Sequence, residues 1–473
     1  MITVHKWLTT ILILTDPFIF LLHEILLRYT MNHFDAIVVG VGGVGSMALR
    51  GLAKRGSGGK FLGIERFSRC HSKGSSHGRT RLYRKAYFEH PQYVPWLEYS
   101  VLEFRQLQKD SGQNLLQECG TLILEHVPAS QQGQLPQYCQ ASMDSALEHN
   151  IPVEELSMTD LKQRYPQFCY KHDMVGVLEP GGGFVRPERV QEEAIKEALD
   201  SGYVELLENA QVKSWKYNGQ TNSVGRPVIE LTLIIDPPQE IKSDVDADRS
   251  ENSLLNGNTE REKIAVTTNS LLISAGAWSG QLIPTWTPLL APTRQLQGWI
   301  DTLSSPRDDH EANDIRYGYE EMPGWVMSTP DYPLPLYGVP ADSDDPEYGH
   351  EIKIGIHGRD EVLNDPLRND PHVSKAEMNE LETAARAALN VPDSPERSFF
   401  SQVTPCIYTM TKDSHFLIGS PHKQVFAVAG LSGHGFKQTP ALGAMMSDFG
   451  LDFDLSRWNF DFCSPERFGV TPV

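Results

Sequence analysis

The sequence predicts an α/β protein in which a domain with a parallel sheet is interleaved with a second domain that has a mixed or antiparallel sheet. Three observations predict this fold. A strand, a glycine-rich turn, a helix and a second strand follow one another within residues 34–65, a second glycine-rich loop precedes a helical pattern near residue 440, and the strand-like runs "VIELTLIID" and "IAVTTNSLLIS" lie between them. With 473 residues, 40% of them hydrophobic and 22% charged, the chain is long enough for two domains with ample cores.

The first element is the segment "FDAIVVGVGGVGSMALRGLAKRG". Its apolar run, Ala36–Val39, predicts a buried parallel strand, and Gly40, Gly42 and Gly45 follow in the spacing of a Rossmann-type dinucleotide turn. One glycine permits the tight turn, one lets the backbone approach a pyrophosphate, and one lets helix pack on strand. The next strand, "KFLGIE", ends at Glu65, whose carboxylate is placed to accept hydrogen bonds from ribose hydroxyls. This pattern indicates a dinucleotide site but does not distinguish NAD from FAD.

The second element is a basic stretch, "RFSRCHSKGSSHGRTRLYRKAY", in an otherwise acidic protein. Arg81 and Arg84 are three residues apart, so on a helix they would point the same way. Their forked guanidinium groups suit a planar carboxylate, which predicts an anion-binding position at the mouth of the nucleotide cleft. A solvent-exposed charged face is the alternative interpretation.

The composition argues against a nucleic-acid partner, a disulfide framework and a metal site. The formal net charge of −19 argues against nucleic acid, because a phosphate backbone requires a basic surface. The six cysteines have no regular spacing, so we expect neither a disulfide framework nor a metal site, and a reducing compartment is indicated.

The first thirty residues differ from the rest. They are apolar but are interrupted by Asp16, Pro17, His23 and Glu24, so they supply neither an uninterrupted spanning helix nor a clear secretory signal. We expect a leader outside the fold, from an upstream start, and we do not favour a membrane anchor or targeting segment. The C-terminal "TPV" is not an SKL-type peroxisomal signal, and the expected location is intracellular, cytoplasmic or peroxisomal.

Five stretches together resemble one family. "GSSHGRTRLYRKAY" is similar to the segment that follows the nucleotide turn in sarcosine oxidases, N-methyltryptophan oxidases and peroxisomal pipecolate/sarcosine oxidases. These are flavoproteins of the glycine oxidase/D-amino-acid oxidase structural class. "LLISAGAWSGQL", "LYGVP" with "IKIGIHG", "TPCIYTMTKDSHFLIG" and "AGLSGHGFKQTPALG" resemble further family segments in the same order, so the likeness runs from about residue 34 to residue 448.

The resemblance implies FAD as the cofactor. In the family a cysteine in the position of Cys406 forms a thioether to the flavin, which implies a covalent link here. Gly433 and Gly435 match the loop over the flavin ring, with Lys437 following them. His77 and Arg81 match positions beside that ring.

The resemblance also assigns residues to the substrate. Arg84 and Lys437 match the two cations that bind the substrate carboxylate, and His357 and Tyr337 match residues that line the substrate pocket. Lys353 matches the lysine that promotes reaction with oxygen, where a fixed cation stabilises developing superoxide. Strand alternation offers another interpretation, in which Lys353 lies on a solvent-exposed face.

The sequence departs from the family at several positions. Tyr83 stands where an aliphatic residue is usual, and Arg79 replaces a common aspartate. Tyr332, Trp325 and Trp299 would shape a bulkier substrate pocket, or would be ordinary core residues.

These assignments predict an interleaved chain with a flexible insertion. The predicted segments are a leader at 1–31, the FAD-binding domain at 32–118, 181–288 and 401–451, the substrate domain at 119–180 and 289–400, the insertion at 237–263, and a C-terminal tail at 452–473.

The resulting hypothesis is an FAD-dependent oxidase of a secondary α-amino acid. Sarcosine, another N-methyl amino acid, or pipecolate or proline would lose a hydride to flavin N5, the imine would be hydrolysed, and O2 would be reduced to hydrogen peroxide. A small amino acid and O2 are therefore the expected partners, with no metal, no nucleic acid and a monomeric state. The alternatives are a flavin dehydrogenase that uses a quinone or an electron-transfer protein, a catalytically silent flavoprotein, and an NAD-dependent dehydrogenase, which would leave Cys406 without a role.

Overall fold

The computed structural model describes residues 32–131, 133–235, 263–302, 316–391 and 398–471. The predicted leader at 1–31 and nearly all of the predicted insertion, residues 237–262, lie outside the described residues. Among the helices in the described ranges, none combines the length and apolar character that crossing a membrane requires.

The first sheet is parallel at its centre. Its strands β19, β12, β1, β2 and β9 pair in parallel, β10 and β11 extend it beside β12, and β18 pairs antiparallel with β19. The strands are β1 (His33–Val39), β2 (Phe61–Ile64), β9 (Val204–Leu207), β10 (Ala210–Thr221), β11 (Pro227–Ile235), β12 (Lys263–Ile273), β18 (Leu417–His422) and β19 (Val425–Ala429).

Both faces of this sheet are covered, which explains why its first strand is apolar and buried from Ala36 to Val39. Ala36 and Val38 pack in one core with helix residues, whereas Ile37 and Val39 point to a second core on the opposite face. Alternate side chains that enter two cores are expected of a central parallel strand.

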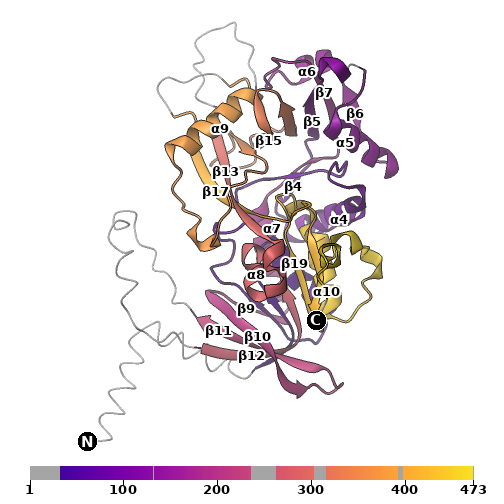
Figure 1. Ribbon diagram of the computed structural model, residues 1–473, viewed down its shortest axis with the longest axis vertical. Helices are drawn as coiled ribbons and strands as arrows, with labels where there is room; N and C mark the ends of the chain where they lie inside the picture. The colour runs from indigo at the N-terminus through magenta and orange to yellow at the C-terminus, as the bar shows by residue number, and fades with distance from the viewer. Residues whose placement is uncertain (1–31, 132, 236–262, 303–315, 392–397, 472–473) are drawn as a thin grey trace, which may run out of the picture.

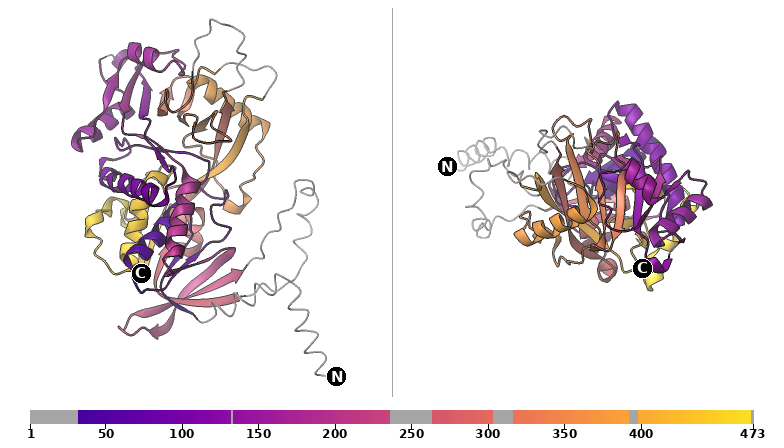
Figure 2. Two further views of the ribbon diagram at one scale, coloured as in Figure 1. Left: turned by 180° about the vertical axis from the view of Figure 1, so that it is seen from behind. Right: turned by 90° about the horizontal axis from the view of Figure 1, so that it is seen from above.

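Helices from both ends of the chain lie together on this sheet. α10 packs on α3 and α4 (Figure 2), which joins the N-terminal unit to the C-terminal segment. The helices of this domain are α3 (Gly43–Arg55), α4 (Val94–Ser111), α7 (Pro187–Asp200), α8 (Ser279–Leu282) and α10 (Thr439–Gly450).

The second sheet is mixed and forms the upper part of the molecule in Figure 1, with α5, α6 and α9 around it. Its order is β17-β13-β16-β15-β14-β5-β7-β6, and only β14 and β5 pair in parallel. The strands are β5 (Thr121–His126), β6 (Glu154–Leu156), β7 (Met174–Glu179), β13 (Ala291–Asp301), β14 (Gly324–Thr329), β15 (Tyr332–Val339), β16 (Glu351–Ile356) and β17 (Gln402–Met410). The helices are α5 (Gln137–Glu148), α6 (Met158–Arg164) and α9 (Lys375–Ala388).

A small third sheet, β3 (Arg81–Tyr83), β8 (Gly183–Val185) and β4 (Leu116–Gln117), completes the fold. The predicted α/β class, with a Rossmann-type parallel sheet and a second mixed sheet, is confirmed. One segment differs from its predicted place. Residues 401–451 were assigned to the nucleotide-binding domain, but β17 pairs along its length with β13 in the second sheet, so this strand links the two parts.

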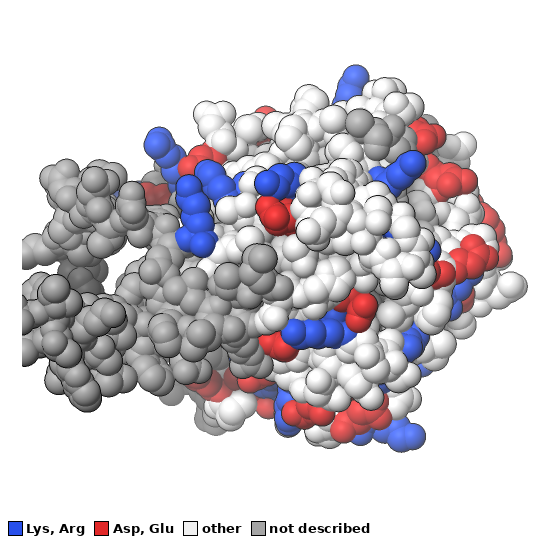
Figure 3. Space-filling model, turned by 90° about the horizontal axis from the view of Figure 1, so that it is seen from below, with Lys and Arg blue, Asp and Glu red and all other residues white. Residues whose placement is uncertain are grey.

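Charged side chains are interspersed over the face seen in Figure 3. Basic and acidic residues alternate there without a continuous basic field.

Candidate active site

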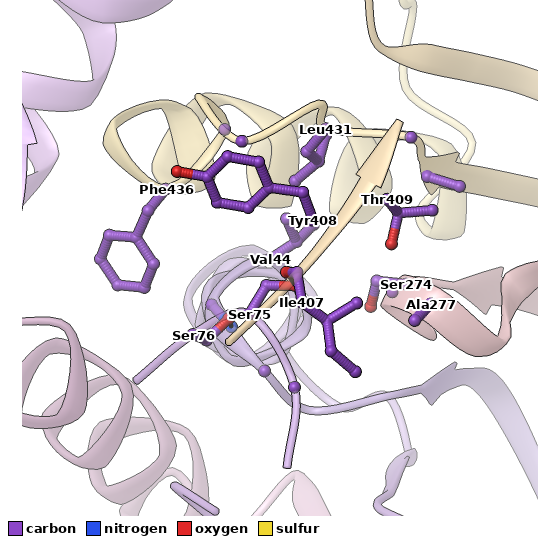
Figure 4. A pocket seen from close by; sticks show the side chains of 18 of the residues that line it. Val44, Ser75, Ser76, Ser274, Ala277, Ile407, Tyr408, Thr409, Leu431 and Phe436 are labelled. Atoms are coloured by element: carbon purple, nitrogen blue, oxygen red, sulfur yellow. Dashed lines mark hydrogen bonds between the residues drawn. The ribbon is translucent and has the colours of Figure 1, made fainter. Parts of the chain in front are cut away.

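A cavity of about 470 Å³ lies between the two sheets and holds most of the predicted site residues. Figure 4 shows one part of its wall, in which Val44, Ser75, Ser76, Ile407 and Tyr408 come from the start of α3, the segment before β3, and β17. The cavity extends from the glycine turn after β1 to β15 and His357. It therefore joins the predicted nucleotide end to the predicted substrate end.

The glycine turn needs its glycines for steric reasons. Gly40 has φ +87°, and a Cβ placed there would lie 2.5 Å from the Ser274 carbonyl oxygen. A Cβ on Gly45 would lie 1.9 Å from the Gly40 carbonyl oxygen, so this residue allows α3 to approach β1. Gly42 lines the cavity, and the N–H of Gly43 donates to Ser76 Oγ at 3.1 Å. The positive end of α3 therefore faces the cavity, as a phosphate requires.

Glu65 marks the nucleotide end of the cavity. It follows β2, and its carboxylate accepts the N–H of Val41 at 2.8 Å and the N–H of Phe67 at 3.0 Å. A carboxylate has further lone pairs beyond these two bonds, so it remains able to accept from ribose hydroxyls. The glycine turn, the helix start and this fixed acid fit a dinucleotide such as FAD.

Arg81 lies beside Cys406. Its Nη1 donates to Gln297 Oε1 at 2.7 Å, and its Nη2 lies 3.8 Å from Cys406 Sγ. The expectation of a helix here was wrong, because Arg81 pairs with Val185 in a strand, and Arg84 lies just after that strand. Both arginines still line the cavity.

Cys406 occupies the middle of β17, opposite Gln295 of β13, and is only 2% exposed. Its sulfur lies 3.9 Å from the Gly74 carbonyl oxygen, close to the segment that carries Ser75 and Ser76. The neighbouring residues Ile407 and Tyr408 line the cavity. A buried sulfur next to a guanidinium fits the thiolate chemistry that a covalent tether needs.

Lys353 is buried, which excludes the alternative interpretation that it lies on a solvent-exposed face. Its Nζ donates to the carbonyl oxygens of Gly78 and Thr80, both at 2.8 Å, and it lies 5.4 Å from the Trp299 ring centre. Burial, with the nearby charge of Arg81, lowers the pKa of Lys353 well below its usual range. The segment that carries Gly78 and Thr80 covers this face of β16, so Lys353 is buried beneath the residues that directly precede Arg81.

His77 lies close to Arg81 and Lys353. It is buried, and among the described residues its Nε2 has no hydrogen-bond partner. Burial and the charges of Arg81 and Lys353 lower its pKa to about 3. The imidazole is therefore neutral at physiological pH.

The two cations predicted to bind the substrate carboxylate, Arg84 and Lys437, lie beside an acid that was not predicted. Arg84 Nη2 donates to Glu89 Oε2 at 2.6 Å, and Arg84, Glu89 and Lys437 all line the cavity. Lys437 Nζ donates to the carbonyl oxygen of His434 at 3.0 Å. We refer to Arg84, Glu89, His434 and Lys437 as the cationic pole.

The charges of the pole are coupled. Burial, reinforced by Arg84, lowers the pKa of Lys437 to about 7. Burial opposes ionisation of Glu89, but Arg84, His434 and Lys437 outweigh it and hold its pKa at about 2. Burial lowers the pKa of His434 to about 3, and its ring is held between the Tyr87 hydroxyl and the Ser414 carbonyl oxygen. The pole therefore carries a permanent internal carboxylate and a lysine that titrates near neutrality.

Tyr337 and His357 complete the wall near the pole. Both line the cavity, and His357 lies 5.6 Å from the Tyr408 ring. Burial lowers the pKa of His357 and raises that of Tyr337, so both are neutral near pH 7. The ring of Tyr337 covers Gly355, where a Cβ would lie 2.4 Å from it.

The loop before α10 brings the C-terminal glycines to the cavity. Gly433 has φ +81°, and a Cβ there would lie 2.3 Å from the Tyr408 ring. Gly435 lines the cavity beside Phe436. Close packing of backbone against an aromatic ring is the reason that this loop uses glycine.

Three aromatic residues considered for the pocket lie elsewhere. Trp325 and Trp299 are buried in the core of the second domain, and Tyr332 donates its hydroxyl to Glu380 at 3.2 Å. None of the three lines the cavity. Within the described ranges, no group of His, Cys, Asp and Glu side chains is arranged to hold a metal ion.

Curated relatives match nearly the whole chain. It is 27% identical over 421 residues to the monomeric sarcosine oxidase of Streptomyces avermitilis, covering 88% of this chain and 94% of the relative. It is also 27% identical over 422 residues to the N-methyl-L-tryptophan oxidase of Yersinia pestis, covering 89% and 95%.

Solved structures share the fold. The open form of NikD, an amino acid oxidase of nikkomycin biosynthesis, aligns with a TM-score of 0.66 at 18% identity, covering 90% of this chain and 97% of that chain. Glycine oxidase from Geobacillus kaustophilus aligns with a TM-score of 0.65 at 15% identity, covering 92% and 98%. Residues 35–449 match the FAD dependent oxidoreductase family, and the chain therefore belongs to that family, as a sarcosine oxidase-like member.

Proposed function

We propose that this protein is an FAD-dependent oxidase of a secondary α-amino acid: sarcosine, another N-methyl amino acid, or pipecolate or proline. The observation that carries the proposal is the cationic pole, whose four residues line the cavity together with Tyr337 and His357. This pole already binds one carboxylate, that of Glu89, through Arg84 at 2.6 Å. A substrate carboxylate presents the same group to the same partners.

The residues of the chain have separable roles in this reaction. Arg84 and Lys437 bind the substrate carboxylate and so fix the orientation of its α-carbon. Tyr337 and His357, both neutral, border the position of the amine without repelling it. When bound, FAD would supply the two-electron acceptor for oxidation of the substrate C–N bond to an imine, with O2 as the final acceptor and hydrogen peroxide as its product.

The side chains of Lys353 and Arg81 are assigned to the oxygen side. Lys353 is buried behind the cavity wall, and Arg81 lines the cavity beside Cys406, where its fixed positive charge favours formation of an anion. Replacement of Lys353 by Met should slow reaction with O2 by about 100-fold or more while an artificial electron acceptor still supports turnover. Equal loss with both acceptors would contradict this assignment, and a wild-type enzyme that ignores O2 would favour the dehydrogenase alternative.

The proposed covalent link to FAD is tested by colour. The purified full-length protein is denatured with acid, and the Cys406→Ala variant is treated in parallel. Yellow colour that stays on the wild-type polypeptide and leaves the variant would support a link at Cys406. Colour that leaves both would contradict it.

The substrate proposal is tested by peroxide formation. FAD-loaded protein is incubated with sarcosine, N-methyl amino acids, pipecolate and proline, with primary amino acids as controls. The Arg84→Met and Lys437→Met variants should each reduce kcat/KM by about 100-fold, because each removes a charged hydrogen bond to the carboxylate. The absence of peroxide with every secondary amino acid, although FAD is bound, would overturn the proposal.

A further inference from the structure

The substrate end of the cavity has an apolar wall that the proposed roles leave unused. Phe88 and Tyr138 line it, together with Val326 of β14. The rings of Phe88 and Tyr138 lie 5.0 Å apart at an angle of 48°. Phe88 directly precedes Glu89, and Tyr138 comes from α5 in the second domain, so the two rings meet across the domain boundary.

The floor of this wall is a row of apolar side chains on one face of the second sheet. Val177, Ile123, Val326 and Tyr337 are paired in register across the neighbouring strands β7, β5, β14 and β15. Paired residues point to the same face of a sheet. Phe88 and Tyr138 pack against this row, which is therefore continuous with the cavity.

Phe88 connects the apolar wall to the cationic pole. The Arg84 guanidinium carbon lies 3.9 Å from the centre of the Phe88 ring and 4.4 Å from that of Tyr87. A carboxylate bound to Arg84 therefore lies next to Phe88. A side chain on the adjacent α-carbon would reach the Phe88–Tyr138 pair.

Tyr138 is fixed in place by a buried acid. Glu125 of β5 is 7% exposed, and its Oε2 accepts the N–H of Tyr138 at 2.8 Å and that of Cys139 at 3.0 Å. A carboxylate at the first turn of a helix is favoured by the unpaired N–H groups there. Tyr138 is thus held on an anchored helix start, and Glu125 is a positioning residue.

We propose that Phe88, Tyr138 and Val326 form a side-chain subsite that selects amino acids with an apolar side chain of about aromatic size, in preference to sarcosine. The inference rests on the proposed function, because it places the substrate carboxylate on Arg84 and Lys437. Sarcosine carries only hydrogen at this position and would leave the wall uncovered. An aromatic side chain would bury its ring between two aromatic edges and Val326.

The first test compares N-methylphenylalanine with sarcosine in the FAD-loaded enzyme. We expect kcat/KM to favour N-methylphenylalanine by about 10- to 100-fold, which corresponds to burial of a phenyl ring. Tyr138→Ala should reduce this ratio by about tenfold, whereas Tyr138→Phe should retain it. Leu147→Ala is the matched control, because Leu147 lies on the same helix and is 71% exposed. A preference for sarcosine, or a ratio that Tyr138→Ala leaves unchanged, would overturn the inference while the proposed function stands.

The second test is independent of turnover. Calorimetric titration measures the affinity of the loaded protein for 3-phenylpropionate and for propionate, which share a carboxylate and differ by the ring. We expect 3-phenylpropionate to bind about 10- to 100-fold more tightly, and Tyr138→Ala to remove most of the difference. If no secondary amino acid is oxidised, the proposed function fails. The ratio of the affinities for 3-phenylpropionate and propionate then tests by itself whether the side-chain subsite exists. Equal affinities for the two acids, or a difference that Tyr138→Ala does not change, would overturn it.

Discussion

The two ends of the cavity are built in different ways. The nucleotide end is made by backbone: a tight turn, a helix start and one acid, all within residues 40–65. The substrate end is made by side chains from distant segments, with Arg84 and Glu89 after β3, Tyr138 on α5 and Lys437 before α10. Substitutions at the nucleotide end should therefore act through the size of the new side chain, and substitutions at the substrate end through its charge and shape.

The two ends also differ in their electrostatics. The nucleotide end presents N–H groups and one carboxylate that accepts two backbone N–H groups. The substrate end buries two cations and balances them with Glu89, whose pKa is held at about 2. Buried charges are costly unless they are paired, so the pole is stable only while a carboxylate occupies it. This difference leads to three predictions.

The largest effect is expected at the nucleotide end. Gly45→Ala would place a Cβ 1.9 Å from the Gly40 carbonyl oxygen, and neither backbone can move without separating α3 from β1. We expect a loss of at least about 3 kcal/mol in the free energy of unfolding, with little or no FAD bound. Denaturant unfolding and the flavin content of the purified protein measure the two effects.

Gly181→Ala is the matched control for this substitution. A Cβ at Gly181 would meet only Lys85 Nζ, at 4.0 Å, so we expect wild-type flavin content. If Gly45→Ala bound FAD as well as the control did, the close helix–strand contact would not be a requirement of the nucleotide end.

A smaller effect is expected at the cationic pole. Glu89→Gln leaves Arg84 and Lys437 buried without their internal anion, and the side chain of Arg84 is only 4% exposed. Loss of one partner of a buried ion pair should lower the free energy of unfolding by about 3 kcal/mol, the lower end of the usual range, because Glu89 is partly exposed. Propionate should stabilise the variant more than the wild type, because it supplies the missing carboxylate.

Thermal unfolding with and without propionate measures this difference. Glu118→Gln is the control, since the pair of Glu118 with Arg105 is largely exposed and should contribute less than about 1 kcal/mol. Equal stabilisation of Glu89→Gln and wild type by propionate would show that propionate does not take the place of the Glu89 carboxylate at the pole.

The contrast between the two ends also explains which features could be predicted from the sequence. The turn at Gly40–Gly45 and the acid Glu65 form one contiguous unit, whose spacing alone indicates its structure. Arg81 was expected on a helix because of local spacing, but its pairing with Val185 decides its conformation. The alternative of a solvent-exposed Lys353 is excluded for a similar reason, because the segment that carries Gly78, distant in sequence, covers that face.

Glu89 and Tyr138 were missed altogether. In sequence, Glu89 is one of 61 acidic residues and has no motif of its own apart from following "RKAYF". Its role becomes visible only when Lys437, from the other end of the chain, lies at the same pole. Tyr138 belongs to a helix whose placement depends on a buried acid in another strand. The resemblance to a family predicted roles for Arg84, Lys437 and Cys406, but it did not point to Glu89 or Tyr138.

The smallest predicted effect is the pH dependence of carboxylate binding. Burial and Arg84 lower the pKa of Lys437 to about 7, so its ammonium loses its proton as pH rises through neutrality. The other titratable members of the pole do not change charge there, because the pKa of Glu89 is about 2 and that of His434 about 3. Burial also lowers the pKa of the nearby His357 below its usual value. Guanidinium groups keep their charge throughout this range.

The affinity for propionate should therefore fall by about tenfold between pH 6 and pH 8.5, as one of two cations at the pole becomes neutral. Bound propionate favours the charged lysine and raises its pKa, so binding near pH 7.5 should take up a proton. Calorimetric titration in two buffers of different ionisation enthalpy measures both quantities. Lys437→Met should bind propionate weakly at both pH values and take up no proton. A pH-independent affinity in the wild type would mean that Lys437 does not titrate in this range.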